Sequence, residues 1–269
     1  MILLCRCANA DVLPVSTLEP VRRWLAESGR AVAAVDDLCG LAARGDERLK
    51  ALAAAGEAVV VLACHARAVR WLLHRAGVEL PPDRLTVLNM RTQSPEEIIS
   101  ILSGMNATGD SVLFEKTQAS SEGKTCAKTQ ASMETEGSIC SLAFSRTLEK
   151  TGDTDPGKWD DPWIPWFPVI DLDRCIHCKQ CLNFCLFGVY ALDEGSKVRV
   201  RNPRKCKTNC PACARLCPEV AIMFPKYAEG PISGREVRPE DLARRDLRVD
   251  PRGMSRGDVL AALKERSRR

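Results

Sequence analysis

Eight cysteines in the C-terminal third of the chain have a spacing that suits metal binding. They form two runs, Cys175-x2-Cys178-x2-Cys181-x3-Cys185 and Cys206-x3-Cys210-x2-Cys213-x3-Cys217, and Pro218 follows the second run. A cubane cluster needs four thiolates around one small volume, and a short Cys-x2-Cys-x2-Cys loop supplies three of them. The spacing therefore predicts two [4Fe–4S] clusters.

Zinc is the main alternative for these cysteines. Cys-x2-Cys pairs also build tetrahedral zinc sites, but such sites usually combine two pairs that a longer loop separates. Two compact runs of four cysteines, the second ending in Cys217-Pro218, favour cubanes. His177 lies inside the first run, and we interpret it as a residue that tunes the local field rather than as a ligand.

The two runs, and the sequence repeat around them, resemble bacterial-type two-cluster ferredoxins. The resemblance implies that the last cysteine of each run binds the cluster of the other run. One cluster would take Cys175, Cys178, Cys181 and Cys217, and the other would take Cys206, Cys210, Cys213 and Cys185. Two departures stand out: Leu186 replaces the proline that often follows the fourth cysteine, and Lys207-Thr-Asn209 widens the first loop of the second run.

A second group of cysteines follows predicted strands in the N-terminal part of the chain. Cys5 and Cys7 follow the first strand, Cys39 follows the second, and Cys64-His65 follows the third. Because adjacent parallel strands end at one edge of an open sheet, we expect Cys7, Cys39 and Cys64 to lie close together. Cys5 or His65 would be a fourth group. The alternative is that these are ordinary buried cysteines, which is our interpretation of Cys5.

The segments 5–11, 37–40 and 61–67 are similar to the N-terminal domain of heterodisulfide reductase A-like proteins. In those proteins, comparable strand-end cysteines hold an additional iron–sulfur cluster. The resemblance therefore implies a third cluster on Cys7, Cys39 and Cys64.

The elements that must position the N-terminal cysteines alternate between strands and helices. Apolar runs predict strands at 2–4, 31–35, 58–63 and 85–88, and helical spacing follows each of them. Ser94, Pro95 and Glu97 predict the start of the last helix, with a capping box and a proline at the first helical position. Four successive strand–helix units predict an open parallel α/β sheet. The first glycine is Gly29, so the first turn lacks the glycines of a dinucleotide site.

Four regions follow from these patterns. We predict an α/β domain at 1–105, a flexible low-complexity linker at 106–160, a two-cluster ferredoxin-type α+β domain at 161–232, and a charged tail with a terminal helix at 233–269. The pentapeptide Lys-Thr-Gln-Ala-Ser occurs twice in the linker. Cys126 and Cys140 also lie there, and we interpret both as bystanders.

The composition of the chain indicates its compartment and the classes of partner to expect. The 269 residues include 14 cysteines, and the net charge is only +4. Without a secretory leader, this many clustered cysteines predicts metal binding in the reducing cytoplasm rather than disulfides. No apolar run reaches the ~18 residues that span a bilayer. The small net charge gives no case for a nucleic-acid partner.

These features predict an iron–sulfur electron-transfer protein that is a subunit or partner of a larger redox enzyme complex. We assign no catalytic residue, because the sequence has only three histidines and no evident nucleophile–base pair. One alternative is a disulfide reductase-like enzyme subunit that uses Cys7, Cys39 and Cys64, as thiols or through a cluster. Another is a scaffold that transfers clusters to a client protein.

Overall fold

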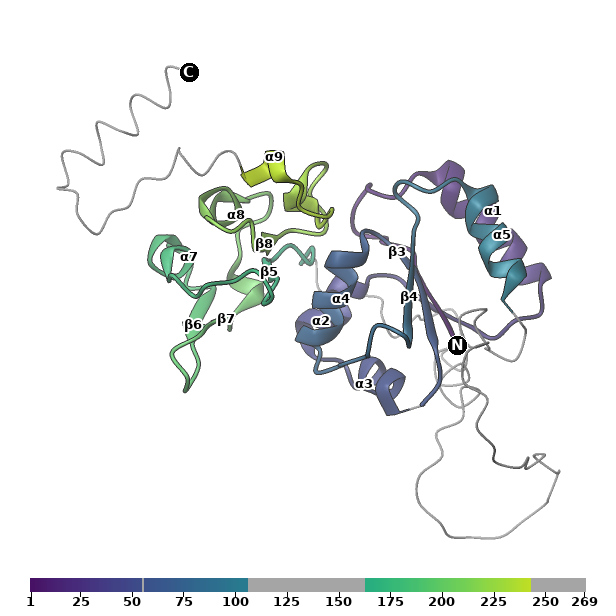
Figure 1. Ribbon diagram of the computed structural model, residues 1–269, viewed down its shortest axis with the longest axis horizontal. Coiled ribbons are helices and arrows are strands. Elements are labelled where there is room, and N and C mark those ends of the chain that lie inside the picture. The colour runs from purple at the N-terminus through teal and green to yellow at the C-terminus, as the bar shows by residue number, and fades with distance from the viewer. Residues whose placement is uncertain (55, 106–162, 243–269) are drawn as a thin grey trace, which may run out of the picture.

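The computed structural model describes residues 1–54, 56–105 and 163–242. The predicted linker with Cys126 and Cys140, and the predicted terminal helix, lie outside these residues. Figure 1 shows an N-terminal sheet with helices on both faces and a smaller C-terminal domain beside it. No helix of the described residues is long and apolar enough to cross a bilayer.

The N-terminal sheet is parallel, as the sequence predicts. Its strands are β1 (Ile2–Cys5), β2 (Val32–Val35), β3 (Val59–Ala63) and β4 (Leu85–Asn89), in the order β2-β1-β3-β4. Leu3 pairs with Ala33 on one side and with Val61 on the other. Side chains on both faces of β1 and β3 are buried, which explains their unbroken apolar sequences.

Helices cover both faces of this sheet. α1 (Val15–Glu27) and α5 (Pro95–Gly104) lie on one face, and α2 (Leu38–Arg44), α3 (Glu47–Ala54) and α4 (Ala66–Arg75) lie on the face toward the C-terminal domain (Figure 1). The predicted capping box opens α5: Ser94 Oγ accepts from the N–H of Glu97 at 3.2 Å, and Glu97 Oε2 accepts from the N–H of Ser94. Between β2 and β3 the sequence predicts one helix, but Gly45, at φ 64°, ends α2 and separates it from α3.

The C-terminal domain repeats a simple unit of loop, one-turn helix and strand. The first unit contains α7 (Gln180–Phe184) and β6 (Tyr190–Leu192), and the second contains α8 (Ala212–Leu216) and β8 (Ile222–Met223). β5 (Val169–Ile170) pairs antiparallel with β8, and β6 pairs antiparallel with β7 (Val198–Val200). The short elements η2 (Pro203–Lys205), η3 (Pro231–Ser233) and α9 (Pro239–Leu242) complete the described chain.

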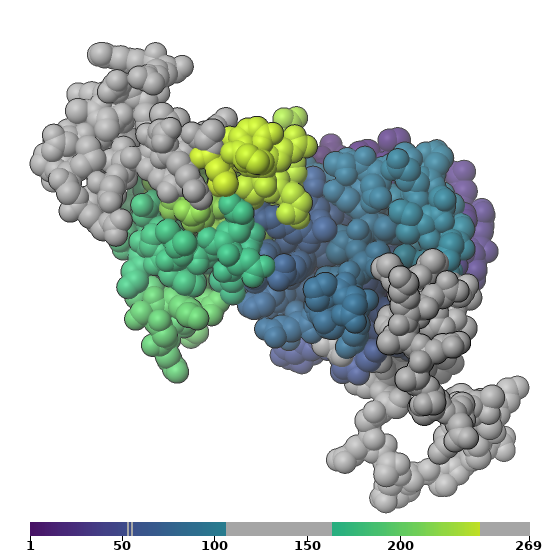
Figure 2. Space-filling model, in the orientation of Figure 1, coloured from purple at the N-terminus to yellow at the C-terminus, as the bar shows by residue number. Residues whose placement is uncertain are grey.

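The two domains are in direct contact, as Figure 2 shows. Phe167 and Val169, at the start of the C-terminal domain, are buried in the N-terminal core. Trp166 instead packs into the core of the C-terminal domain and stacks on Phe224, with ring centroids 5.2 Å apart. Gly234 comes so close to α4 that an added Cβ would lie 2.5 Å from the Cβ of Ala68. The segment after residue 232, which we expected to belong to the tail, therefore packs on the N-terminal domain at this point.

Candidate iron–sulfur centres

The first predicted ligand set surrounds a single cavity. Cys175, Cys178, Cys181 and Cys217 all line it, so the last cysteine of the second run joins three from the first. Ile170, Val198 and Ile222 form apolar walls. This is the grouping that the ferredoxin resemblance implies.

Backbone conformation shapes the loop around this cavity. His177 and Lys179 have φ angles of 51° and 64°, in the left-handed region that non-glycine residues seldom adopt. Such turns direct successive N–H groups toward one point and make an anion-binding concavity that suits iron–sulfur sites. On the opposite side, the N–H of Ala221 donates to Cys217 Sγ at 3.3 Å.

His177 is positioned beside the first set rather than among its members. Its Nδ1 accepts from the N–H of Val198 at 3.2 Å and lies 3.6 Å from Cys175 Sγ. This nitrogen already has a backbone partner, which fits the interpretation of His177 as a neighbour of the ligands.

The second predicted set also converges. Burial and then the charges of Cys213, Cys210 and Cys185 raise the pKa of Cys206 to about 12, so the four thiols are near one another. Asn209, at φ 61°, turns the wider first loop of this run, and asparagine is among the residues that tolerate that conformation. Leu186, which stands where the family often has proline, is 93% exposed.

One-turn helices connect the two sets. α7 carries Cys181 of the first set, and the N–H of Cys185 of the second set donates to the carbonyl of Cys181 at 3.1 Å. α8 repeats this relation in reverse, with Cys217 donating to the carbonyl of Cys213 at 3.1 Å. The spacing Cys-x3-Cys thus places consecutive cysteines one helical turn apart, facing different sets.

The donor groups fit cubane clusters. Burial, followed by the charges of neighbouring thiols, raises the pKa of Cys181 to about 12, so a cationic centre must displace protons from this site. The Tyr190 hydroxyl is buried beside Cys213, and no hydrogen bond of ordinary geometry satisfies it among the described residues. A cluster sulfur would be an acceptor for it. Among the described residues, no three Cys, His, Asp or Glu side chains converge closely enough to hold a single metal ion.

The N-terminal cysteines lie at the carboxyl edge of the parallel sheet. Cys5, Cys7, Cys39 and Cys64 are all buried, and the structure brings them together, since the charges of Cys7 and Cys64 both raise the pKa of Cys5 and of Cys39. Burial is the larger cause in each case. Cys7 adopts a φ of 51°, which turns the chain sharply after β1.

Cys5, rather than His65, accompanies the other three cysteines. Its sulfur accepts from the N–H of Leu38 at 3.4 Å, at the start of α2. His65 instead places Nδ1 3.0 Å from Asn89 Nδ2. Burial, with the charges of Arg91 and Arg235, lowers the pKa of His65 to about 4. Cys5 is buried in its strand as expected, but it also lies beside the predicted site.

Sequence reasoning missed the charged residues around these four thiols. Asp37 precedes α2, Arg91 follows β4, and Lys226 belongs to the C-terminal domain. The Lys226 ammonium pairs with the Asp37 carboxylate although 189 residues separate them. No local pattern in the sequence could reveal that contact.

Comparison with known proteins finds matches to the C-terminal domain. Residues 167–218, which contain all eight cysteines of the two runs, match the family model of the 4Fe-4S dicluster domain. Ferredoxin-3 of a Nostoc species is 35% identical over 75 residues, and the match covers 76% of that protein and 21% of this chain. This chain belongs to the 4Fe-4S ferredoxin family.

Two further proteins are similar to this chain. An uncharacterized ferredoxin of Methanocaldococcus jannaschii is 48% identical over 63 residues, which are 23% of this chain and only 42% of that protein's length. The pyruvate synthase subunit PorD of Methanothermobacter marburgensis is 31% identical over 80 residues, which are 30% of this chain and 90% of PorD. No solved structure matches this ferredoxin.

Proposed function

We propose that this ferredoxin carries electrons through two [4Fe–4S] clusters whose ligands are exchanged between its two cysteine runs. The observation that carries the proposal is the cavity lined by Cys217 together with Cys175, Cys178 and Cys181. The second cluster would be held by Cys206, Cys210, Cys213 and Cys185. Apolar walls around the first set would exclude water and so help to set its reduction potential.

The connection through α7 and α8 supports electron exchange between the two clusters. Cys181 and Cys185 are one helical turn apart and serve different clusters in this assignment, and so are Cys213 and Cys217. The charge of Cys213, from the second set, acts on the pKa of Cys181 in the first set, which supports a short distance between the two sets. Two short helices would therefore hold the clusters at a fixed separation.

The protein's partner would be a larger redox enzyme complex. Support comes from two relatives, of Methanothermobacter marburgensis and Methanocaldococcus jannaschii, that are named as pyruvate synthase subunit PorD. We place this ferredoxin in the same role, as a subunit or a dedicated partner in the cytoplasm that supplies or accepts electrons.

We further propose a third cluster held by Cys5, Cys7, Cys39 and Cys64. Four buried thiols at one sheet edge match the number and type of ligands that a cubane needs. The alternative, a reactive thiol that attacks a disulfide, is disfavoured because burial raises the pKa of Cys64 to about 12. A thiol is a good nucleophile only when its pKa is low enough to give thiolate.

Coulometric titration of the anaerobically purified chain tests the electron-carrying role. Each [4Fe–4S] centre takes up about one electron, so two clusters accept about two electrons per chain and three accept about three. Reversible uptake and release to an acceptor dye is expected. A chain that retains its iron but takes up no electrons would contradict the proposal.

A further inference from the structure

The N-terminal cysteine site has a cation that comes from the other domain. Lys226 follows β8 in the ferredoxin-type domain, yet its side chain is only 3% exposed and its ammonium pairs with Asp37 beside Cys39. We propose that Lys226 is a positioning residue that supplies a buried positive charge beside the N-terminal cluster and thereby makes the reduction potential of that cluster higher than it would be without this charge. This inference rests on the third cluster proposed above.

Asp37 fixes where the Lys226 charge lies. One oxygen of Asp37 caps α2 by accepting from the N–H of Gly40 at 3.2 Å, and the other accepts from Asn9 Nδ2 at 3.0 Å. The carboxylate is 1% exposed and cannot swing into solvent. Lys226 is therefore held over the first turn of α2, the turn that contains Cys39.

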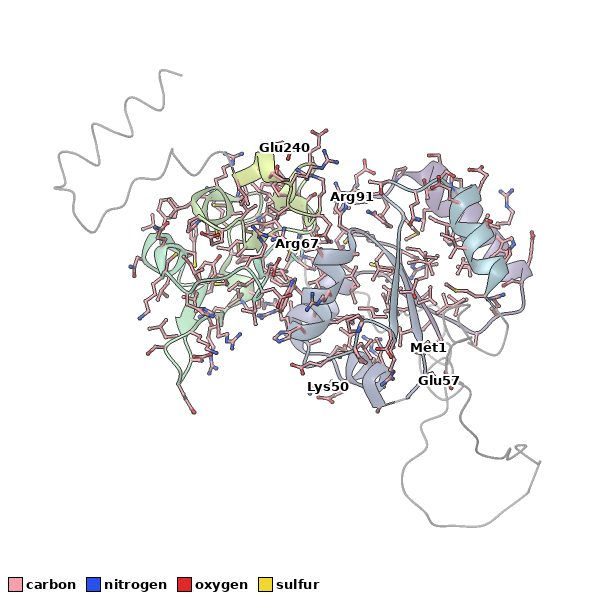
Figure 3. All side chains as sticks on the ribbon, in the orientation of Figure 1. Met1, Lys50, Glu57, Arg67, Arg91 and Glu240 are labelled. Atoms are coloured by element: carbon pink, nitrogen blue, oxygen red, sulfur yellow. The ribbon has the colours of Figure 1, made fainter. Side chains whose placement is uncertain are left out.

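Arg91 fastens the backbone on either side of Lys226. Its guanidinium donates to the carbonyls of Pro225 at 3.3 Å and Tyr227 at 3.1 Å, and also to the carbonyl of Ala228. Arg91 follows β4, so a residue of the N-terminal domain binds the loop 225–228, and Lys226 of that loop binds Asp37 of the N-terminal domain. Figure 3 labels Arg91 at the boundary of the two domains.

Lys226 and the groups around it affect one another's pKa values. Burial by itself would lower the pKa of Lys226, because it disfavours the charged ammonium. The negative charges of Cys39, Asp37 and Cys7 outweigh burial and raise this pKa above its ordinary value. Burial raises the pKa of Cys7, and the positive charges of Lys226 and Arg91 partly offset this rise. Lys226, held by Asp37, and Arg91 therefore lie within electrostatic range of the thiols.

A cluster at this site would bring excess negative charge. Four thiolates outweigh the charge of a [4Fe–4S] core, Asp37 adds another negative charge, and reduction adds one more. A buried cation interacts strongly with that added electron, because the surrounding protein screens charge far less than water does. Lys226 therefore favours the reduced centre, and the centre keeps this cation only while the two domains are docked.

The test is an EPR-monitored potentiometric titration of the full chain carrying Lys226→Met. Cys39→Ala identifies the N-terminal signal, because that variant should lose it. In Lys226→Met we expect the midpoint of this signal to fall, while the C-terminal clusters keep theirs. Lys226→Arg keeps the charge and should keep the midpoint. Lys50→Met removes an exposed lysine elsewhere on the N-terminal domain and should change nothing.

Asp37→Asn keeps the proposal testable if Lys226→Met fails to assemble. An asparagine keeps one oxygen that can accept from the N–H of Gly40, but it loses the second acceptor that Asn9 uses and the negative charge, so the midpoint should rise. Loss of packing alone does not predict shifts of opposite sign in the two variants. A full complement of iron with unchanged midpoints would overturn the role of Lys226 alone. Absence of iron from the N-terminal site of the unaltered chain would overturn the third cluster, and this inference with it.

Discussion

Arg67 and Asp171 form a buried ion pair across the two domains, with Arg67 Nε 2.6 Å from Asp171 Oδ2. The same guanidinium donates to the carbonyl of Val220 at 2.6 Å. Val220 has an unusual φ of 53° and precedes Ala221, whose N–H donates to Cys217 Sγ. Within the N-terminal domain, Arg67 comes three residues after Cys64. One side chain of α4 thus binds the segment of the C-terminal domain that follows Cys217, and Figure 3 labels Arg67 between the two domains.

Removing Arg67 should strongly destabilise the docked molecule. Arg67→Ala would leave the Asp171 carboxylate buried without its partner, and breaking a buried pair in this way typically costs about 3–5 kcal/mol. Urea denaturation of the anaerobic protein measures the loss. The matched control is Arg70→Ala, whose pair with Asp173 is about 60% exposed on both sides and should contribute less than about 1 kcal/mol. Equal losses in the two variants would show that the buried pair does not hold the interface.

The close approach of Gly234 to α4 predicts a second interface variant. In Gly234→Ala the new methyl group would lie 2.5 Å from the Cβ of Ala68, at a φ of 99° that alanine seldom adopts. We expect a loss of stability of about 1–3 kcal/mol, as for other overpacked sites. Gly45→Ala is the control, because Gly45 is also left-handed, with a φ of 64°, but has no atom within 4 Å of the added Cβ. A smaller loss at Gly234 than at Gly45, measured by thermal denaturation, would argue against the close contact.

The proposed exchange of ligands between the two runs predicts which cysteines bind the same cluster. Cys217→Ser should alter the same EPR signal as Cys178→Ser, although the two residues lie in different runs. Cys185→Ser should alter the signal that Cys206→Ser alters. The physical reason is that changing one thiolate ligand perturbs only the cluster it binds. If Cys217→Ser and Cys206→Ser changed one signal and Cys185→Ser and Cys178→Ser the other, each cluster would be held within a single run.

The fourth ligand of the proposed N-terminal cluster can be tested in the same manner. Cys5→Ala should remove about four irons per chain, because Cys5 lies beside Cys7 and Cys64. His65→Gln should retain them, since the His65 ring bonds Asn89 instead. Iron analysis after anaerobic purification distinguishes the two outcomes. Loss of iron in His65→Gln with full retention in Cys5→Ala would reverse the assignment.

Much of the fold could be predicted because its signals are local. The apolar residues of β1 and β3 mark buried parallel strands, and Ser94 with Glu97 marks the start of α5. The one-turn helices α7 and α8 have a similarly local origin, since the spacing within each cysteine run fixes the loop and the short helix around it. The division of residues 38–54 into α2 and α3 was not predicted, although Gly45 is the residue that causes it.

The contacts between the domains could not be read from the sequence. Arg67 and Asp171 are 104 residues apart, and nothing in the pattern around either residue specifies the other. The same is true of Lys226 and Asp37. Such pairs depend on how two finished domains meet, whereas periodicity and capping report only on neighbouring residues. The charges that surround the N-terminal cysteines were missed for this reason.

We propose that this ferredoxin holds two [4Fe–4S] clusters in its C-terminal domain and a third in its N-terminal domain. Iron and acid-labile sulfide analysis of the anaerobically purified full chain, combined with EPR spin quantitation after reduction, tests it most directly. We predict about twelve irons and twelve sulfides per chain, with about three spins. About eight irons would remove the third cluster and leave the two-cluster domain. Fewer than eight irons, or zinc in their place, would contradict the account.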